Sequence, residues 1–497
     1  MFANRLRILL PALLALTAFA SSQVVPQTFE GINATAPGVG GTFDVDPNGA
    51  IGTKQYLEWT NPVYQAYSKT APFQAVFASP IIGDTPWAQN NMSDCAGNSG
   101  DVVVLFDHLA SRWVIARRQG QNSYFYCLAV SSTDDLAASG LTWFAYELSL
   151  NSLLGQNAQG HTYFPDYPRI GSWPDAYYVS IDLEDPDSSF KEVGTLVCAF
   201  DRTNMISGVA AHTPQCFRYP NPFSGLFLEH SLLPADIDGV TPPPAGAVEY
   251  FISIQNPAFN SSNTLNLWQF HVDWTTPANS TFTGPVAVKS GSYVPGCYWK
   301  LNRPNTVCVP EPSTSSTGNS IDSVGDRVMQ RFAYRNFRGS PSYQSYLVTH
   351  TVQVGLTSRS QTGIRWHELR FVTGALSVVH SGTINPGDSN YRFMPSIAQD
   401  KVGNLAVGYS VAGTTLSPSI RASYANLRNH LAPTEFSIMS GTADEENSSH
   451  WGDYTSMTVD PVDDCTFWYV NEYFTTNQIT APTWQTRIAN FKIPTCK

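Results

Sequence analysis

The feature that most constrains the fold of this chain is a repeat that runs through its whole length. Each copy has a short apolar stretch, a turn that carries aspartate and an aromatic stretch, as in MTVDPVDDCTFWYV. Asp107 follows Asp46 by 61 residues, and Asp175 follows Asp107 by 68. Near the end of the chain, Asp460 follows Asp400 by 60. A regular period of this length indicates radial repetition or stacking of one supersecondary unit.

Two weaker copies, which begin at Asp236 and Ser323, fill the long interval in the middle of the chain. The count is then about seven units of roughly 70 residues each. Segments such as LVCAF, YFISI and TFWYV are rich in β-branched and aromatic residues and are bounded by Gly, Pro, Asn and Asp, which predicts strands. Two β-sandwiches in tandem are the alternative, but they would not produce the regular period.

We therefore predict an all-β fold, a β-propeller of about seven four-stranded blades that closes through its termini, with six blades also possible. A closed ring of small sheets leaves only short exposed strand edges. The turn aspartates are interpreted as structural, because aspartate at a turn accepts hydrogen bonds from free backbone N–H groups. The recurring tryptophans Trp113, Trp143, Trp366 and Trp484 are likewise expected in blade cores.

The first 20 residues have the pattern of a secretory signal peptide. Arg5 and Arg7 precede an apolar run that ends in small residues, with cleavage expected after Ala20. The apolar run is too short for a membrane span, so residues 21–497 are predicted to be a single secreted propeller domain, extracellular or periplasmic.

The charge balance excludes some partners. The formal net charge is −11, and it becomes −13 once the two arginines of the leader are removed. An acidic chain of this kind is not expected to bind nucleic acid or an anionic membrane. Charged residues make up only 13% of the chain and aromatic residues 12%. We expect a monomer whose partner is a polysaccharide or glycoconjugate.

Eight cysteines in an exported chain predict disulfides. Their order favours local pairs, although order alone does not fix connectivity. The pairs expected are Cys95 with Cys127, Cys198 with Cys216, Cys297 with Cys308 and Cys465 with Cys496.

One segment resembles the Asp-box of sialidase-like propellers, SxDxGxTW. Ser132, Thr133 and Asp134 give its first half, and Gly140 to Trp143 give its second half after an insertion. The stretches GDVVVLFDHLASRW, DYPRIGSWPDAYY and YRFMPSIAQDKVGNLAVGYS also resemble a group of exported bacterial propeller proteins without an assigned reaction. These resemblances imply the propeller fold and export.

In a propeller, the residues just before each innermost strand converge at one end of the central axis. Arginines and acids are concentrated at these positions. The candidates are Asp101, Asp166, Arg169, Asp326, Arg327, Arg331, Tyr391, Arg392, His450, Trp451, Asp453 and Tyr454.

Arginines from separate blades can hold a carboxylate or sulfate through paired N–H groups, and sialidase-like enzymes use an arginine cluster for their acidic sugar. By this analogy Arg169, Arg327 and Arg392 are predicted to bind the anion. Further substrate contacts are predicted at Asp101, Tyr391 and Trp451.

For the reaction itself, the same analogy assigns Asp453 or Asp326 as acid or base, and Tyr454 with Glu472 as a nucleophile pair. The FRIP-type motif of true sialidases is absent from the chain. The predicted function is a glycoside hydrolase or uronate lyase that prefers an acidic sugar. The alternatives are a non-catalytic propeller that binds glycan or protein at the cell surface, and ion pairs that simply hold neighbouring blades together.

No cofactor is predicted, and no cysteine and histidine spacing indicates zinc. Calcium is a weaker possibility. Asp44, Asp46, Asn48 and Gly49 match the first half of a calcium loop, but Gln55 stands where a bidentate Glu is needed. A tight turn before a strand explains the same pattern.

Overall fold

The computed structural model describes residues 24–42, 44–97, 100–120, 123–220, 231–255, 262–297, 307–313, 320–355, 361–427, 433–446, 448–477 and 480–497. The predicted signal peptide lies outside these residues. The described chain is all-β, as predicted, apart from six short helical turns. These are α1 (Thr85–Ala88), η1 (Ser93–Cys95), α2 (Asn151–Leu154), η2 (Pro186–Ser188), α3 (Arg202–Met205) and η3 (Pro277–Asn279). None of the described helices has the length and apolar character needed to cross a bilayer.

Most strands form four-stranded antiparallel sheets in which each strand pairs with the next along the chain. The first contains β2 (Asn48–Ile51), β3 (Gln55–Trp59), β4 (Val63–Ser68) and β5 (Ile81–Ile82). The second contains β6 (Val103–Asp107), β7 (Arg112–Gln119), β8 (Phe125–Ser131) and β9 (Trp143–Ser149). The third contains β10 (Phe164–Ser172), β11 (Tyr177–Asp185), β12 (Lys191–Phe200) and β13 (Gln215–Tyr219).

The next two groups of four strands join into one eight-stranded sheet, because their first strands pair in parallel with Ala235 opposite Phe332. One group contains β14 (Leu233–Ile237), β15 (Glu249–Ile254), β16 (Ser262–His271) and β17 (Thr281–Tyr293). The other contains β20 (Val328–Phe337), β21 (Tyr343–Gln353), β22 (Thr362–Val372) and β23 (Ala375–Ile384). Between them in sequence, β18 (Val307–Val309) and β19 (Ile321–Asp322) form a small separate sheet.

The remaining strands form two more four-stranded sheets. One contains β24 (Tyr391–Gln399), β25 (Asn404–Gly413), β26 (Leu416–Asn426) and β27 (Thr434–Met439). The other contains β28 (Ser456–Val459), β29 (Thr466–Phe474) and β30 (Trp484–Lys492), with β1 (Gln27–Asn33) as its fourth strand. The start of the described chain is therefore paired, antiparallel, with its last strand.

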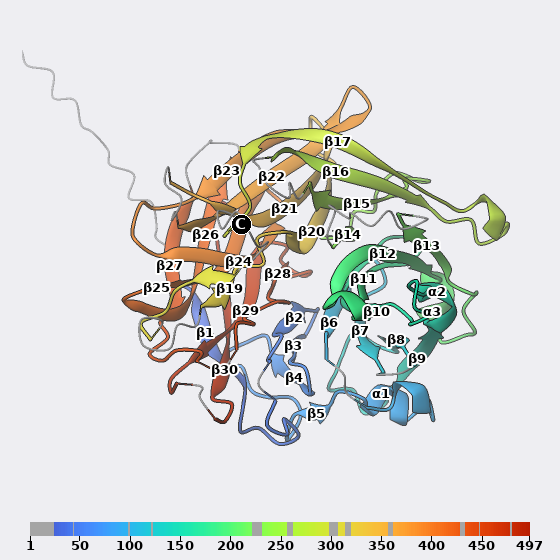
Figure 1. The fold of residues 1–497 in the computed structure, drawn as a ribbon, viewed down its shortest axis with the longest axis horizontal. Helices are drawn as coiled ribbons and strands as arrows, with labels where there is room; N and C mark the ends of the chain where they lie inside the picture. Colours follow the sequence, from blue (N-terminus) through green and yellow to red (C-terminus); the bar gives the residue numbers. More distant parts are fainter. Residues whose placement is uncertain are drawn as a thin grey trace, which may run out of the picture.

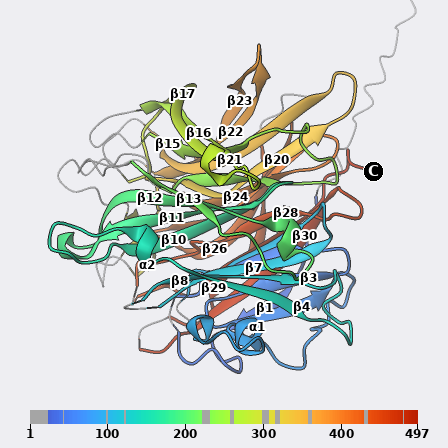
Figure 2. The same cartoon turned by 90° about the vertical axis from the view of Figure 1, so that its right-hand side faces the viewer.

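The sheets follow one another around the centre of the molecule, and the first strand of each lies innermost (Figure 1). The first strands contact one another in the order β2, β6, β10, β14, β20, β24 and β28, and β28 contacts β2 again. Apolar side chains pack mainly between neighbouring sheets, as in the cluster that joins Val114 and Leu128 to Val179 and Leu196. In the side view, α1 lies near one end of the molecule and β17 and β23 lie near the other (Figure 2).

Two local predictions are confirmed. All four expected disulfides are present, and Trp113, Trp143, Trp366 and Trp484 are buried. Asp107 caps its turn as expected, because its Oδ1 accepts hydrogen bonds from the N–H groups of Leu109 and Ala110 at 3.0 Å. The interpretation of Asp46 was wrong. It precedes β2, where its carboxylate accepts a hydrogen bond from Asn61, and does not lie at a turn after a strand.

Each innermost strand begins near a residue with positive φ. These residues are Asp46 (44°), Asp101 (58°), Tyr167 (49°), Ser231 (47°), Val324 (44°), Met394 (49°) and Gly452 (67°). Positive φ is uncommon for residues other than glycine. Positive φ therefore recurs near the start of each first strand. At each of these positions the backbone changes direction, which affects where the neighbouring side chains point.

Candidate functional site

Several predicted site residues lie together at the end of the molecule where the first strands begin. Asp101 precedes β6, Arg327 precedes β20, and Asp453 and Tyr454 precede β28, while Arg169 lies within β10 after an irregularity in its pairing. The first strands lie side by side around the centre, and the β14–β20 pair runs parallel, so their starts meet at one end. We call the following residues the entrance cluster: Asp46, Asp101, Tyr167, Arg169, Arg327, Asp453 and Tyr454.

Arg169 is the centre of this cluster. Its guanidinium carbon lies 3.7 Å from the ring centroid of Tyr167 and 4.4 Å from that of Tyr454, so two aromatic rings contact the cation. The residue is fully buried. Nη2 donates a long hydrogen bond of 3.4 Å to the backbone carbonyl of Asp453. Within the described chain, Nε and Nη1 have no hydrogen-bond partner. Buried N–H groups are rarely left unpaired, so this pair indicates a site for a ligand or solvent.

Arg327 contacts the same tyrosine, with its guanidinium carbon 4.7 Å from the ring centroid of Tyr167. Unlike Arg169, it is well paired. Nε lies 2.9 Å from Asp326 Oδ1, and Nη1 lies 3.4 Å from Asp182 Oδ2. Asp326 is thus committed to an ion pair with its neighbour in sequence.

The carboxyl groups of the cluster are unusual because they are buried near one another. Burial raises the pKa of Asp101 to about 7, and the charges of Asp166 and Asp453 add to this effect. Arg118 opposes it through an ion pair of 3.0 Å with Asp101. Burial also raises the pKa of Asp46 well above its usual range. Protonated carboxyl groups are therefore available in this cluster near neutral pH.

Asp453 has a different environment. Its Oδ2 lies 3.8 Å from Nδ1 of His450, and this interaction raises the pKa of the exposed histidine to about 9. The buried Oδ1 of Asp453 has no hydrogen-bond partner among the described residues, and the same holds for the Tyr454 hydroxyl. Burial raises the pKa of that hydroxyl well above its usual value.

Glu472 lies in β29, beside the loop that contains Asp453. Its Oε1 accepts a hydrogen bond of 2.6 Å from the N–H of Gly452. Burial raises its pKa well above the usual range, and Glu445, Asp46 and Asp453 add to the effect. The predicted partner of Tyr454 is thus a buried, protonated carboxyl group that also holds the backbone of the site loop.

Three predicted residues have other environments. Arg392 is fully buried and donates four hydrogen bonds of 2.7–3.0 Å to Asp388 and Glu435. Because Glu435 belongs to β27, the strand furthest from the centre, the Arg392 guanidinium points away from the entrance cluster. The structure therefore brings two of the three predicted arginines together. Trp451 is buried against Phe474 and donates to Ser410, and Tyr391 is half-buried in the same apolar cluster.

Two members of the cluster were not recognised in the sequence. Tyr167 was not recognised because an aromatic residue in a strand usually belongs to the core. Asp46 was missed because it was aligned with the turn aspartates. One sequence signal could have indicated further acidic residues near this site. In β11, Asp182 and Glu184 alternate with apolar residues near the end of a largely apolar strand. Burial raises the pKa of Glu184 to about 8, with the Asp166 charge adding.

The residues of the possible calcium loop are largely engaged elsewhere. The Asn48 side chain donates to the carbonyl of Tyr454 and accepts from Val104, both at 2.7 Å. Gln55 donates to Asp135 at 2.8 Å, across to the next sheet. In the part of the chain that is described, no group of three or more His, Cys, Asp or Glu side chains is arranged to hold a metal. Calcium binding stays a prediction.

No protein-family model matches the sequence. No curated protein matches it either. Among solved structures, the chain is similar to the GH43 endo-arabinanase from Bacillus licheniformis, with 13% identity over 67% of this chain and 96% of that one, at a TM-score of 0.30. A protein of unknown function from Dyadobacter fermentans is 9% identical over 94% of this chain and 100% of that one, at a TM-score of 0.27.

A third similar structure is the catalytic domain of the GH62 α-L-arabinofuranosidase from Coprinopsis cinerea. It is 8% identical over 66% of this chain and 90% of that one, at a TM-score of 0.28. These similarities are weak, so the sugars that these enzymes act on remain properties of those proteins. The resemblance to sialidase-like propellers stays a prediction.

Proposed function

We propose that this protein is a secreted seven-bladed β-propeller that acts on extracellular glycan through the entrance cluster. The blade count is supported by the seven innermost strands that contact one another in a ring, and closure by the pairing of β1 with β30. Export is supported by the four disulfides, which fit an extracellular protein.

The observation that carries the proposal is the buried Arg169 guanidinium with two unpaired nitrogens. A planar guanidinium offers parallel N–H groups that match a carboxylate or a sulfate. An acidic sugar would satisfy these groups, and the rings of Tyr167 and Tyr454 would hold the guanidinium in place. Arg327 adds positive charge beside the same ring of Tyr167.

Hydrolysis of a glycosidic bond needs one carboxyl group that donates a proton and one that is ionised. Burial raises the pKa of Asp101 to about 7, whereas the Asp453 carboxyl lies 3.8 Å from the exposed imidazole of His450. We therefore assign Asp101 as proton donor and Asp453 as base or nucleophile. Two carboxyl groups in one site with environments that differ in this way are the usual arrangement for acid and base roles.

A uronate lyase is a second candidate. Arg169 would neutralise the uronate carboxylate, and the unpaired hydroxyl of Tyr454 would take the neighbouring proton. The raised pKa of Tyr454 disfavours this role, because a base must lose its own proton first. Hydrolysis is therefore the better-supported reaction.

Binding without catalysis is the alternative function, and two sets of ion pairs favour it. Arg327 pairs with Asp326 and Asp182, and Arg118 pairs with Asp101. Carboxylates that are held in ion pairs are poor proton carriers, but they do not hinder recognition of a ligand. The same anionic sugar would then bind Arg169 and leave unchanged.

A panel of acidic and neutral polysaccharides tests the proposal, with release of reducing ends and of unsaturated uronate as readouts. We expect turnover of an acidic glycan, and a loss of about 100-fold or more in rate for Asp453→Asn. Lys54→Gln, at an exposed site on the first sheet, is the control and should match the wild type.

Equal rates for the wild type and Asp453→Asn on every substrate would rule out the hydrolase. If no product forms but an acidic oligosaccharide binds, and Arg169→Met abolishes the binding, the binding function is correct. If neither turnover nor binding of any acidic glycan is found, the role of the entrance cluster is refuted.

A further inference from the structure

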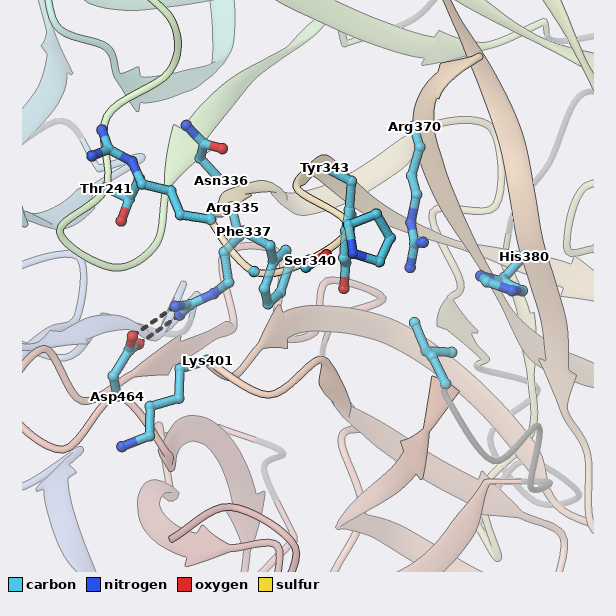
Figure 3. Close-up of a pocket in the computed structure, with 14 residues that line it drawn as sticks. Thr241, Arg335, Asn336, Phe337, Ser340, Tyr343, Arg370, His380, Lys401 and Asp464 are labelled. Atoms are coloured by element: carbon cyan, nitrogen blue, oxygen red, sulfur yellow. Dashed lines mark hydrogen bonds and ion pairs between the residues drawn. The ribbon is translucent and has the colours of Figure 1, made fainter.

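A second candidate site lies at the opposite end of the innermost strands. A cleft of about 740 Å³ is lined by residues from three sheets, including Thr241 after β14, Arg335 of β20, Lys401 after β24 and Asp464 after β28 (Figure 3). These residues lie at or beyond the ends of their strands, whereas the entrance cluster lies near the starts. The volume falls in the range of ligand-binding pockets, roughly 300–1,000 Å³.

The cleft is positively charged, although the whole chain has a net charge of −11. Four of its lining residues are Arg or Lys, and Asp464 is the acid among them. That acid is fully engaged, since Arg335 donates to its two oxygens at 2.8 and 2.7 Å. Arg338 and Lys401 are exposed, and Arg370 is partly exposed. Glu368 offsets the charge of Arg370, so the exposed Arg338 and Lys401 supply most of the positive charge that attracts an anion.

A buried glutamate positions two of the basic side chains. The Glu368 side chain is fully buried and accepts hydrogen bonds from Arg370 Nε at 2.7 Å and from His380 Nδ1 at 2.6 Å. Ser345 donates a third, at 2.7 Å. The guanidinium carbon of Arg370 also lies 3.8 Å from the ring centroid of Tyr343. Glu368 thus fixes Arg370 and His380 on neighbouring strands before any ligand arrives.

The positive groups stand on two sides of the cleft. Lys401 lies on one side with the Arg335–Asp464 pair, and Arg370 and His380 lie on the other, with Tyr343 between them (Figure 3). A ligand that uses the basic side chains of the whole cleft has to contact both sides at once. A chain that carries an anionic group on successive units can do so.

We propose that this cleft binds an acidic oligosaccharide through carboxylate or sulfate groups on successive sugars. Arg370 and His380 hold one anionic group, and the exposed Lys401 attracts the next, while the exposed Arg338 adds positive charge to the cleft. The site is separate from the entrance cluster, so a glycan chain can be held at this end whether or not the other end is catalytic.

Isothermal titration with oligogalacturonate, a sulfated oligosaccharide, a neutral oligosaccharide of equal length and inorganic sulfate tests the proposal. We expect the wild type to bind one or both acidic oligosaccharides, more weakly as salt increases, and not the neutral one. The double variant Arg338→Glu/Lys401→Glu should weaken this binding by about tenfold or more. Lys289→Glu is the matched control, because Lys289 is exposed on β17 and does not line the cleft.

The proposal is overturned if the double variant binds as tightly as the wild type, or if the neutral oligosaccharide binds equally well. The proposal also fails if inorganic sulfate binds and neither acidic oligosaccharide does. Arg169→Met separates the two ends of the molecule: binding that is lost in Arg169→Met but kept in the double variant belongs to the entrance cluster and refutes this site. A lack of glycan turnover contradicts only the proposed hydrolase.

Discussion

Two buried arginines show how the surroundings of one residue type separate a structural role from a site. Arg331 is paired, because Nε lies 2.7 Å from Asp236 and Nη2 lies 2.9 Å from Asp238. It ties β20 to β14 and the residue that follows it. Arg169 is equally buried, but it has aromatic rings for neighbours, and two of its nitrogens have no hydrogen-bond partner among the residues that the structure describes. The two arginines are equally buried, so their hydrogen-bond partners decide whether each is structural or part of a site.

We predict that replacing Arg331 lowers the free energy of unfolding much more than replacing Arg169. Arg331→Met should lower the free energy of unfolding by about 3–5 kcal/mol, because it leaves two buried carboxylates without a cation. Arg169→Met should stay within about 1 kcal/mol of the wild type, since the lost ring contacts are offset by relief of unpaired buried N–H groups. Urea denaturation measures both. Equal losses in the two variants would contradict the distinction.

Among the elements, the junction between the first and last sheets is held by one buried carboxyl group. Glu58 of β3 accepts hydrogen bonds from the N–H of Ile32 in β1 at 3.0 Å and from Thr486 in β30. Tyr67 donates a third, at 3.2 Å. Burial raises the pKa of Glu58 to about 7 from its usual 4.5. The Glu58 carboxyl, which joins β3 to β1 and β30, is thus partly protonated near neutral pH.

This shift predicts how stability depends on pH. Between pH 4.5 and 7 the folded chain keeps a proton on Glu58 that the unfolded chain has released, so stability falls as pH rises through this window. Its full size is about 3 kcal/mol. Glu58→Gln removes this contribution. The difference in melting temperature between the variant and the wild type should therefore grow in favour of the variant from pH 4.5 to 8, and parallel curves would refute the assignment.

In the whole molecule, the first and last strands of the described chain lie side by side in one sheet. β1 pairs with β30 and places Phe29 opposite Ile488. Phe29 also stacks on Phe73, with ring centroids 4.6 Å apart, which connects the last sheet to the first. Without β1, the backbone of β30 would be an open edge, and open edges pair with other chains.

A chain that begins at Ala34 tests this closure. We expect it to unfold at a lower temperature and to self-associate in light scattering, because the edge of β30 is exposed. A synthetic peptide with the β1 sequence QTFEGIN should restore both properties by adding as a strand, whereas a scrambled peptide should not. Unchanged stability and a monomeric state without the peptide would show that the ring does not depend on β1.

The repeat, the all-β class and the disulfide pairs could be predicted from the sequence, because each depends on residues near one another along the chain. Strand periodicity and turn chemistry are local, and the order of the cysteines favoured neighbours such as Cys465 and Cys496. The residues with positive φ near the starts of the innermost strands could not be predicted in this way. The seven of them, among them Asp46, Tyr167 and Met394, share a backbone conformation but are not of one residue type.

The charged residues near the starts of the innermost strands can be identified from their order along the chain. Which of them meet depends on how the strands are arranged in the folded molecule. Arg169 and Arg327 converge on Tyr167, whereas Arg392 turns outward to Glu435 in β27. The direction of a long side chain depends on which carboxylate across the fold can pair with it. For Arg392 that partner is Glu435, 43 residues further along the chain, and strand pairing within the β24–β27 sheet sets its place.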